Sequence, residues 1–156
     1  MSKDRGTTLP TDLLDFLSSG EPASKFHEVI LFSTMDEDGW PRHGLLSPRE
    51  VVAKDPSRLL LLLYSNSRST ANVEREGKIS LVLVNPNMSY YVSCIAQSLP
   101  PMAEAPSETL FELKVERVLE DFLPTARILT GITFEGYDPG MTQENRELVF
   151  QRLLER

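Results

Sequence analysis

The stretch of the chain richest in ligand-binding groups is YSNSRSTANVEREGK, residues 64–78, which follows directly on the apolar run RLLLLL. If a buried strand ends here and a helix begins, hydroxyls, backbone N–H groups and the positive end of a helix dipole meet at one point. A guanidinium adds charge-assisted hydrogen bonds. These are the groups that hold phosphate. The side chains that would supply them are Ser65, Ser67, Arg68, Ser69 and Thr70.

The same stretch has a second interpretation, a polar cap at the start of a helix. Ser, Thr and Asn are common cap residues because their oxygens accept hydrogen bonds from the first N–H groups of a helix. On composition alone the cap is the commoner use of such residues, and both interpretations stay open at this point.

The sequence gives little support for a metal site, a reactive cysteine or a hydrolase site. The two histidines, His27 and His43, and the single cysteine, Cys94, lack the spacing of zinc ligands, so no metal site is expected. Cys94 lies within an apolar strand pattern and is expected to be an inert core thiol. No serine-esterase motif occurs. No side chain stands out as a general acid or base, and His43 is only a speculative candidate.

Composition narrows the class of protein. The 156 residues carry a net charge of −7, from 16 basic and 23 acidic side chains. This balance disfavours nucleic acids and anionic membranes as partners. One cysteine fits a reducing compartment. The N-terminal residues lack the apolar core of a signal peptide, and the longest aliphatic run, residues 59–63, is too short to span a membrane. We expect a cytoplasmic protein with a single domain over residues 1–156.

Hydrophobic periodicity and turn residues predict many short strands and three helices. The N-terminal segment 1–25 is expected to be helical, with a helix over residues 10–20 capped by Thr11 or Asp12 and stopped by Gly20. Further helices are expected over residues 67–76 and 142–156, the last capped by Thr142. Strands are expected over residues 28–35 and 40–47, joined by the turn DEDG, and over residues 49–54, 58–65, 78–84 and 88–99.

The C-terminal third is harder to interpret. Residues 100–108, PPMAEAPSE, are expected to form a surface loop. Residues 109–121 fit a strand better than a helix, and residues 122–134 predict a helical turn followed by a short strand over residues 131–134. The whole pattern favours a mainly β (α+β) protein, a small antiparallel barrel flanked by short helices.

The order of these segments resembles the pyridoxamine 5'-phosphate oxidase-like family of FMN-binding split β-barrels. The resemblance rests on FSTMDEDGWPRHGLLSP, RLLLLLYSNSRSTANVEREGKISLVLV, SYYVSCIA, ELKVERVLED and GITF, and covers roughly residues 26–134. It implies a strand pair joined by D-x-x-G-x-P, then an apolar strand, a helix start with a Ser-Arg pair and a further strand pair. It also implies a homodimer with FMN at the subunit interface.

Carried over by position, the resemblance assigns two sets of cofactor contacts. The strand after Pro41 lines the flavin, and the helix start holds its phosphate. The first set is His43, Gly44, Leu45, Leu46 and Ser47; the second is Ser65, Ser67, Arg68 and Ser69, with Thr70 and Asn72 close by. The partner's SYYVSC strand would complete the pocket, with Tyr90 or Tyr91 near the ring.

Two positions depart from the family pattern. Many relatives have a lysine where this chain has Ser69, and an arginine where it has Gly44. The C-terminal residues also lack an arginine-rich substrate segment. We therefore expect an FMN-binding oxidoreductase of unassigned small-molecule substrate that does not oxidise vitamin B6. The alternatives are a non-catalytic dimeric barrel that binds flavin, haem or a phosphorylated ligand, and a structural protein that has lost the cofactor.

Overall fold

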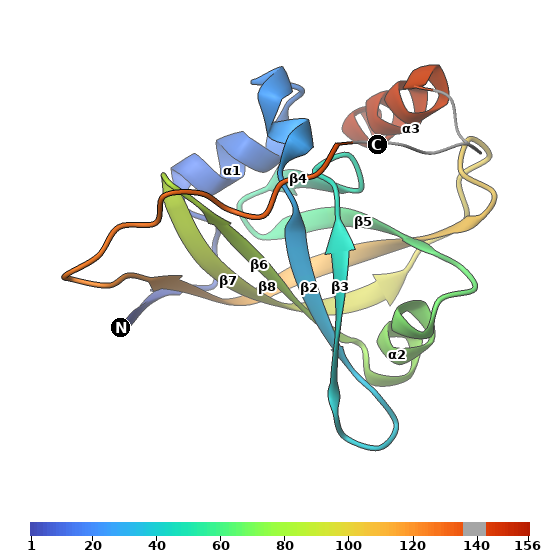
Figure 1. The fold of residues 1–156 in the computed structure, drawn as a ribbon. Coiled ribbons are helices and arrows are strands. Elements are labelled where there is room, and N and C mark those ends of the chain that lie inside the picture. The colour runs from blue at the N-terminus through green and yellow to red at the C-terminus, as the bar shows by residue number, and fades with distance from the viewer. Residues whose placement is uncertain (136–142) are drawn as a thin grey trace.

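A computed structural model describes residues 1–135 and 143–156 (Figure 1). These residues contain eight strands, three α-helices and one short 3-10 helix. In chain order the elements are β1 Ser2–Gly6, α1 Thr11–Ser18, η1 Ala23–His27, β2 Ile30–Met35, β3 Pro41–Leu46, β4 Val51–Asp55, β5 Arg58–Tyr64, α2 Arg68–Glu76, β6 Lys78–Asn85, β7 Met88–Ser98, β8 Glu108–Asp121 and α3 Gln143–Glu155.

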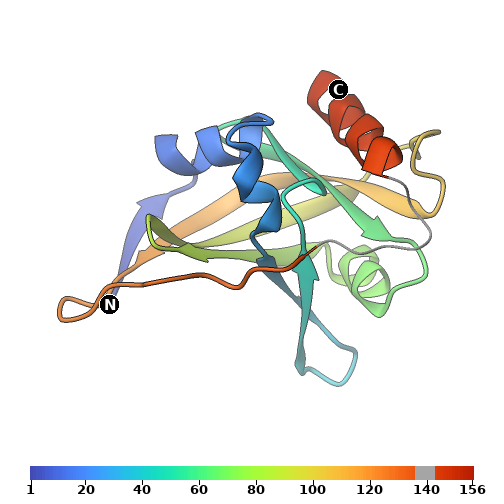
Figure 2. The same ribbon diagram turned by 45° about the horizontal axis from the view of Figure 1, so that its top comes forward.

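One antiparallel sheet makes up the body of the molecule, in the strand order β3-β2-β6-β7-β8-β5-β4, with β1 paired to β8. The sheet is strongly curved, with α1 and α3 on one side and α2 beside the β2–β3 hairpin (Figures 1 and 2). The two ends of this path, β3 and β4, are joined by the turn at residues 47–50. In that turn the Glu50 carbonyl accepts a hydrogen bond from the Leu62 N–H at 2.9 Å. The mainly β, antiparallel architecture is as the sequence predicts.

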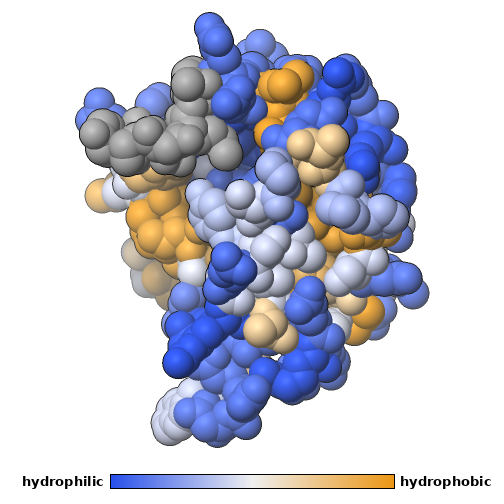
Figure 3. All heavy atoms as spheres, turned by 90° about the vertical axis from the view of Figure 1, so that its right-hand side faces the viewer, coloured by the Kyte–Doolittle hydropathy of each residue, from blue (hydrophilic) through white to orange (hydrophobic). Residues whose placement is uncertain are grey.

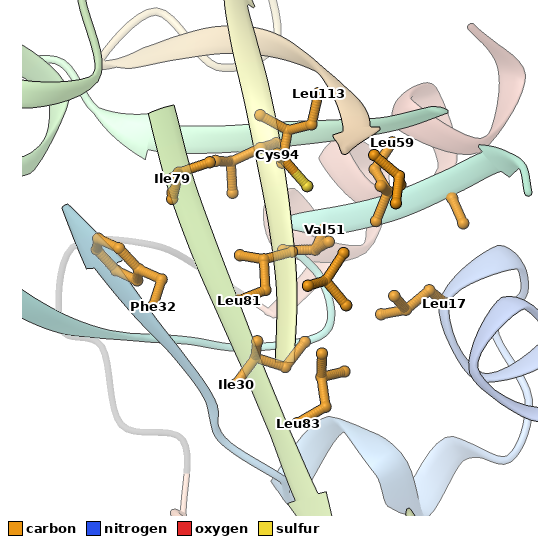
Figure 4. Packing of buried hydrophobic residues seen from close by; sticks show 14 of the residues in the cluster. Leu17, Ile30, Phe32, Val51, Leu59, Ile79, Leu81, Leu83, Cys94 and Leu113 are labelled. Carbon is orange, nitrogen blue, oxygen red and sulfur yellow. The ribbon is translucent and has the colours of Figure 1, made fainter. Parts of the chain in front are cut away.

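Alternate residues of the strands fill the concave side of the sheet (Figure 4). On β6 these are Ile79, Leu81 and Leu83, and on β7 they include Val92 and Cys94. This is the two-residue period of a strand with one buried face. Burial raises the pKa of the Cys94 thiol to about 12, which makes it the inert core cysteine that the sequence predicts.

A second apolar cluster lies on the other side of β4 and β5, under α3. The outward residues of β5, Leu60 and Leu62, pack there with Phe150 of α3, and the Phe26 ring meets the Phe150 ring edge-on at a centroid distance of 5.2 Å. Strand β5 is thus buried on both faces, as predicted from its unbroken apolar run. Met102 and Ala105 of the connecting loop are also buried in this cluster, so the prediction of a surface loop over residues 100–108 is wrong for them.

The N-terminal segment departs from the sequence prediction. Residues Ser2–Gly6 form strand β1, so the expectation of a helical segment over residues 1–25 is wrong there. Helix α1 is present as predicted, but Pro10 occupies its cap position and no side chain caps it. It ends at Ser19 in extended backbone, one residue before the predicted stop at Gly20.

Residues 122–134 contain neither the predicted helical turn nor a regular strand. The segment makes isolated bridges from Leu123 to Ala126 and from Thr133 to Glu28. The C-terminal helix is present as α3, while its predicted cap, Thr142, lies outside the described residues. The strand predicted over residues 109–121 is confirmed as β8.

Gly44 of β3 stands directly opposite Phe32 of β2 in the hairpin register. The Phe32 ring is buried and lies across the glycine, so that a Cβ at position 44 would stand 2.3 Å from two of its ring carbons. The ring therefore occupies the space that a side chain at position 44 would need. The packing of this ring therefore gives a steric reason for a glycine at position 44.

We predict that Gly44→Ala destabilises the protein by about 1–3 kcal/mol, the usual cost of overpacking a closed core, which lowers the thermal midpoint by several degrees. Gly20→Ala is the matched control, because its Cβ would meet only ordinary contact at 3.7 Å. Adding Phe32→Leu to Gly44→Ala should restore part of the loss. Equal midpoints for the two alanine variants would show that the ring yields without cost.

Candidate functional site

A cavity of about 180 Å³ opens where the curved sheet fails to close, between β3 and β5 and beside the start of α2. We call it the split cavity. Strand ends supply its apolar wall, and the α2 start and two carboxylates supply its polar groups. Its lining residues are Phe32, Gly44, Leu45, Leu46, Glu50, Leu62, Leu63, Tyr64, Ser67, Ser69 and Glu108. Five of the residues expected to contact a cofactor therefore meet here, from two distant segments of the chain.

The start of α2 is capped by its own residues. The Ser67 hydroxyl accepts a hydrogen bond from the Thr70 N–H at 3.0 Å, and the Thr70 hydroxyl donates to the Tyr64 carbonyl at 2.8 Å. Thr70 is buried and lines no part of the split cavity. At the other end, Gly77 closes the helix in the left-handed conformation at φ 65°. For Ser67 and Thr70, the helix-cap interpretation describes what the side chains do.

Ser69 differs from its neighbours. Its side chain is 9% exposed and faces the split cavity, and its hydroxyl has no hydrogen-bond partner among the residues that the structure describes. The first N–H groups of a helix also lack intrahelical acceptors, and in α2 the cap satisfies only that of Thr70. A hydroxyl that lines a cavity without a protein partner can bond to a ligand or a water molecule there. Ser69 and the α2 N-terminus therefore form a polar end of the cavity with donors to offer.

Two of the predicted phosphate contacts line a different hollow from Ser69. Arg68 is exposed and lines a separate hollow of about 370 Å³ together with acidic residues of the β2–β3 turn. The Asn72 amide is buried and donates to Thr34 Oγ1 at 3.0 Å and Asp36 Oδ1 at 2.8 Å, which ties α2 to the hairpin. Hydrogen bonds from Arg42 and Asn72 lower the pKa of Asp36.

The remaining predicted residues lie outside the split cavity. Ser65 is exposed, and its hydroxyl shares a hydrogen bond with Thr109 Oγ1 at 3.0 Å, joining β5 to β8. His43 is exposed on β3, with its Nδ1 2.8 Å from Ser33 Oγ. Ser47 accepts a hydrogen bond from the Arg49 N–H at 3.0 Å and lines a smaller hollow next door.

That smaller hollow, of about 30 Å³, continues the split cavity inward toward α3. The two share Glu50, Leu62, Tyr64 and Glu108, and the inner one is completed by Ser47, Arg49, Arg146 and Val149. The Arg49 guanidinium stacks on the Phe26 ring at 4.0 Å, and its buried Nε has no hydrogen-bond partner within residues 1–135 and 143–156. The volume of this inner hollow is enough for about one water molecule.

Sequence analysis missed the two acidic residues of the cavity, Glu50 and Glu108. Glu50 Oε2 accepts a hydrogen bond from the Ser47 N–H. Burial, with a smaller contribution from the nearby Glu108 carboxylate, raises the pKa of Glu50 to about 7 against the hydrogen bond from the Ser47 N–H, which lowers it. Burial also raises the pKa of Glu108. Neither residue stands in a recognisable sequence motif, because only the tertiary fold brings the two together and reduces their exposure to water.

The described residues contain no group of three or more His, Cys, Asp and Glu side chains that could hold a metal ion. Among the same residues, no helix is both long enough and apolar enough to cross a membrane. The face that carries α2 and α3 is mainly hydrophilic, and hydrophobic residues reach its surface in separate patches (Figure 3).

Comparison with known proteins adds one curated relative and a group of solved structures. No protein-family model matches the chain. An uncharacterised protein of Bacillus subtilis strain 168, YclD, is 28% identical over 128 residues, which is 81% of this chain and 83% of that protein.

Solved structures with a similar fold include the following three. A provisionally assigned pyridoxamine 5'-phosphate oxidase from Lactobacillus delbrueckii superposes with a TM-score of 0.60 at 20% identity, over 76% of this chain and 98% of its own. An FMN-binding protein from Syntrophomonas wolfei gives 0.53 at 13% identity, over 70% and 88%. The haem storage protein HutZ from Vibrio cholerae gives 0.52 at 14% identity, over 74% and 96%.

These likenesses show the fold. The chain has the split β-barrel architecture of the pyridoxamine 5'-phosphate oxidase-like structures, as its sequence predicts. Proteins with this architecture include ones described as FMN-binding and as haem storage, so the fold alone does not decide the cofactor.

The two serines at the start of α2 should respond differently to alanine. Ser67→Ala removes the cap and should lower the free energy of unfolding by about 1 kcal/mol. Ser69→Ala removes a hydroxyl without a partner and should change it by less than about 0.5 kcal/mol in either direction. Denaturant unfolding of both variants under one set of conditions makes the comparison. A loss at Ser69 as large as that at Ser67 would mean that its hydroxyl is already engaged in the free protein.

Stability should depend on pH through Glu50. Its pKa is raised from 4.5 to about 7, so between these values the folded protein holds a proton that the unfolded chain has released. The free energy of unfolding should therefore fall as pH rises from about 4.5 to 7, by up to roughly 3 kcal/mol for this group. This fall is measured by comparing the free energies of unfolding of the wild type and of Glu50→Gln at pH 5 and pH 7.5.

Glu74→Gln is the control, because Glu74 is an exposed carboxylate on α2. We expect Glu50→Gln to flatten the fall and Glu74→Gln to leave it in place. Identical pH profiles in all three proteins would contradict a desolvated Glu50.

Proposed function

We propose that this protein binds FMN in the split cavity, with the phosphate at the N-terminus of α2 and the flavin ring along Gly44, Leu45 and Leu46. The observation that carries the proposal is Ser69: a mostly buried residue that lines the cavity at the N-terminus of α2 and whose hydroxyl has no partner in the described part of the chain. Helix N-termini favour phosphate through their N–H groups and dipole. The FMN-binding structure with this fold supports the choice of ligand.

The residues of the cavity fit the two halves of FMN differently. Its apolar wall, which includes Phe32 and Leu62, suits a flat aromatic ring, and its α2 end suits a phosphate. Arg68 is the one basic residue in this part of the motif and lies across the helix. Its charge acts on a phosphate over a longer distance than a direct ion pair. We therefore expect weaker retention of FMN than in a site that contacts the phosphate with several basic residues.

We further propose that the protein is a homodimer with FMN at the subunit interface. At about 180 Å³ the split cavity is smaller than the 300–1,000 Å³ of typical cofactor sites. A second copy would supply the missing wall. A groove of about 510 Å³ on β2, β3, β6 and β7, which includes the exposed side chains of Met35 and Ile95, is the surface proposed for that contact.

The proposed activity is that of an oxidoreductase acting on a small molecule other than vitamin B6. When bound, FMN supplies two-electron chemistry, taking a hydride at its N5 atom and passing electrons on. The protein would bind the phosphate at Ser69, orient the ring against β3 and keep water from it with the apolar wall. The acidic net charge of −7 supports a small-molecule rather than a nucleic-acid partner, and the reduced thiol of Cys94 suits the cytoplasm.

A non-catalytic haem-binding barrel is the second candidate, and His43 is the observation that favours it. Hydrogen bonding of its Nδ1 to Ser33 Oγ leaves Nε2 of an exposed imidazole as a possible iron ligand, oriented by its neighbour. The haem storage structure with the same fold supports it. Haem would give a Soret band that is lost in His43→Ala, whereas flavin gives bands near 370 and 450 nm that survive the change.

The test is the visible absorbance of the purified protein, recorded before and after incubation with excess FMN and desalting. We expect retained flavin bands in the wild type and loss of most of the flavin from Ser69→Ala, because its hydroxyl directly faces the phosphate site. Arg68→Ala should lower the affinity severalfold through lost long-range attraction.

The control is Arg117→Ala, which removes an exposed arginine of β8 that lines neither hollow. It should retain flavin as the wild type does. A colourless protein that fails to take up FMN would return the α2 start to a helix cap and remove the flavin proposal.

A further inference from the structure

The polar groups that line the split cavity are of two opposite electrostatic kinds. At the start of α2, backbone N–H groups and the Ser69 hydroxyl offer donors and a positive dipole. Glu50 and Glu108 line the same cavity, and they are the only charged residues among the described residues that do so. A negatively charged ligand held at the α2 start therefore shares a small, largely apolar space with two carboxyl groups.

Several neighbours determine whether Glu50 holds a proton. From its own turn come the Ser47 N–H, which donates to its carboxylate, and Arg49; from β8 comes Glu108, and from α3 comes Arg146. Tyr64 of β5 lines the same space. The basic groups and the hydrogen bond favour the charged carboxylate, whereas burial and Glu108 oppose it. Burial dominates, so that the pKa of Glu50 stands at about 7 in the free protein.

An anion placed in this space shifts that balance further. Like charges in a site of low polarity disfavour each other, so the bound anion makes the ionised form of Glu50 less stable. By linkage, the anion then binds more tightly to the protein whose Glu50 carboxyl is protonated. We propose that Glu50 is a specificity-determining residue of the split cavity: it admits an anionic ligand together with a proton and weakens the binding of that anion when ionised.

The inference rests on the proposed function, because it takes FMN as the anionic ligand. Riboflavin, the neutral relative of FMN, carries the same ring without the phosphate, so the charge state of Glu50 should affect the binding of the two ligands differently. Only the phosphorylated form should feel the charge of Glu50. The cavity would thus bind FMN tightly at pH values below neutral and release it more readily at pH values above neutral.

The test measures the dissociation constants of FMN and riboflavin by quenching of flavin fluorescence at pH 6 and pH 8.5. In the wild type we expect the affinity for FMN to fall by roughly tenfold or more between the two values, as one proton is lost from Glu50. In Glu50→Gln this fall should disappear relative to the wild type, and FMN should bind more tightly at pH 8.5. Comparing the two proteins cancels the titration of the FMN phosphate itself, whose second pKa is about 6 by analogy with other phosphomonoesters.

Two further measurements make the result specific. Glu74→Gln, which removes an exposed carboxylate from α2, should behave as the wild type does. Calorimetry of FMN binding at pH 7.5 in buffers of different ionisation enthalpy should show proton uptake in the wild type and less in Glu50→Gln. Neither readout depends on catalytic turnover.

Each alternative outcome has a distinct meaning. FMN that binds with the same pH dependence in the wild type and in Glu50→Gln overturns this inference and leaves the proposed function standing. A Glu50-dependent fall that is equally large for riboflavin also overturns it, because the phosphate charge would then not be the cause. Failure of both proteins to bind FMN at either pH overturns the proposed function and this inference together.

Discussion

A single backbone hydrogen bond, from the Leu62 N–H to the Glu50 carbonyl, fastens the turn between the two ends of the sheet onto β5. The path of paired strands begins at β3 and ends at β4, so this turn connects the two edge strands of the curved sheet. The turn brings the end of β3 over β5 without pairing the two strands. The space left between them is the split cavity, and its position follows from how the sheet closes.

The same turn accounts for the chemistry of that cavity. It carries Ser47, Arg49 and Glu50 within four residues, and it lies between the concave core and the apolar cluster under α3. A carboxylate at this place is less exposed to bulk water than one on an open surface. Its charge is therefore governed by the few groups that the fold brings near it. An acidic residue becomes sensitive to ligand charge without belonging to any motif.

The features that the sequence predicts well are those encoded locally. The apolar run of β5, the alternation along β7 and the Ser67-to-Gly77 frame of α2 each lie within one element, and all three are present. Contacts over longer distances were harder. Strand β1 is polar and exposed throughout and is held by its pairing with β8, so its five residues carry no hydrophobic pattern.

The candidate site divides in the same way. Gly44 and Ser69 lie in one cavity, as the motif order predicts, whereas Arg68 and Asn72 line a separate hollow beside the β2–β3 turn. The hydroxyl residues of this short stretch therefore have different roles. Ser67 and Thr70 cap the helix, Ser65 forms a hydrogen bond to Thr109 of β8, and Ser69 faces the cavity. Residue type alone does not separate these tasks, since the cap and the phosphate cradle use the same groups.

The contact between Gly44 and Phe32 bears on how this barrel can change over time. A basic side chain at position 44 has no room while the ring lies across it, so the two positions are coupled as an epistatic pair. A lineage that acquires a large residue at position 44 must first, or simultaneously, accept a smaller one at position 32. Related chains should therefore show the two sites varying together, and the order of substitutions between a glycine-bearing and an arginine-bearing cavity should be constrained rather than free.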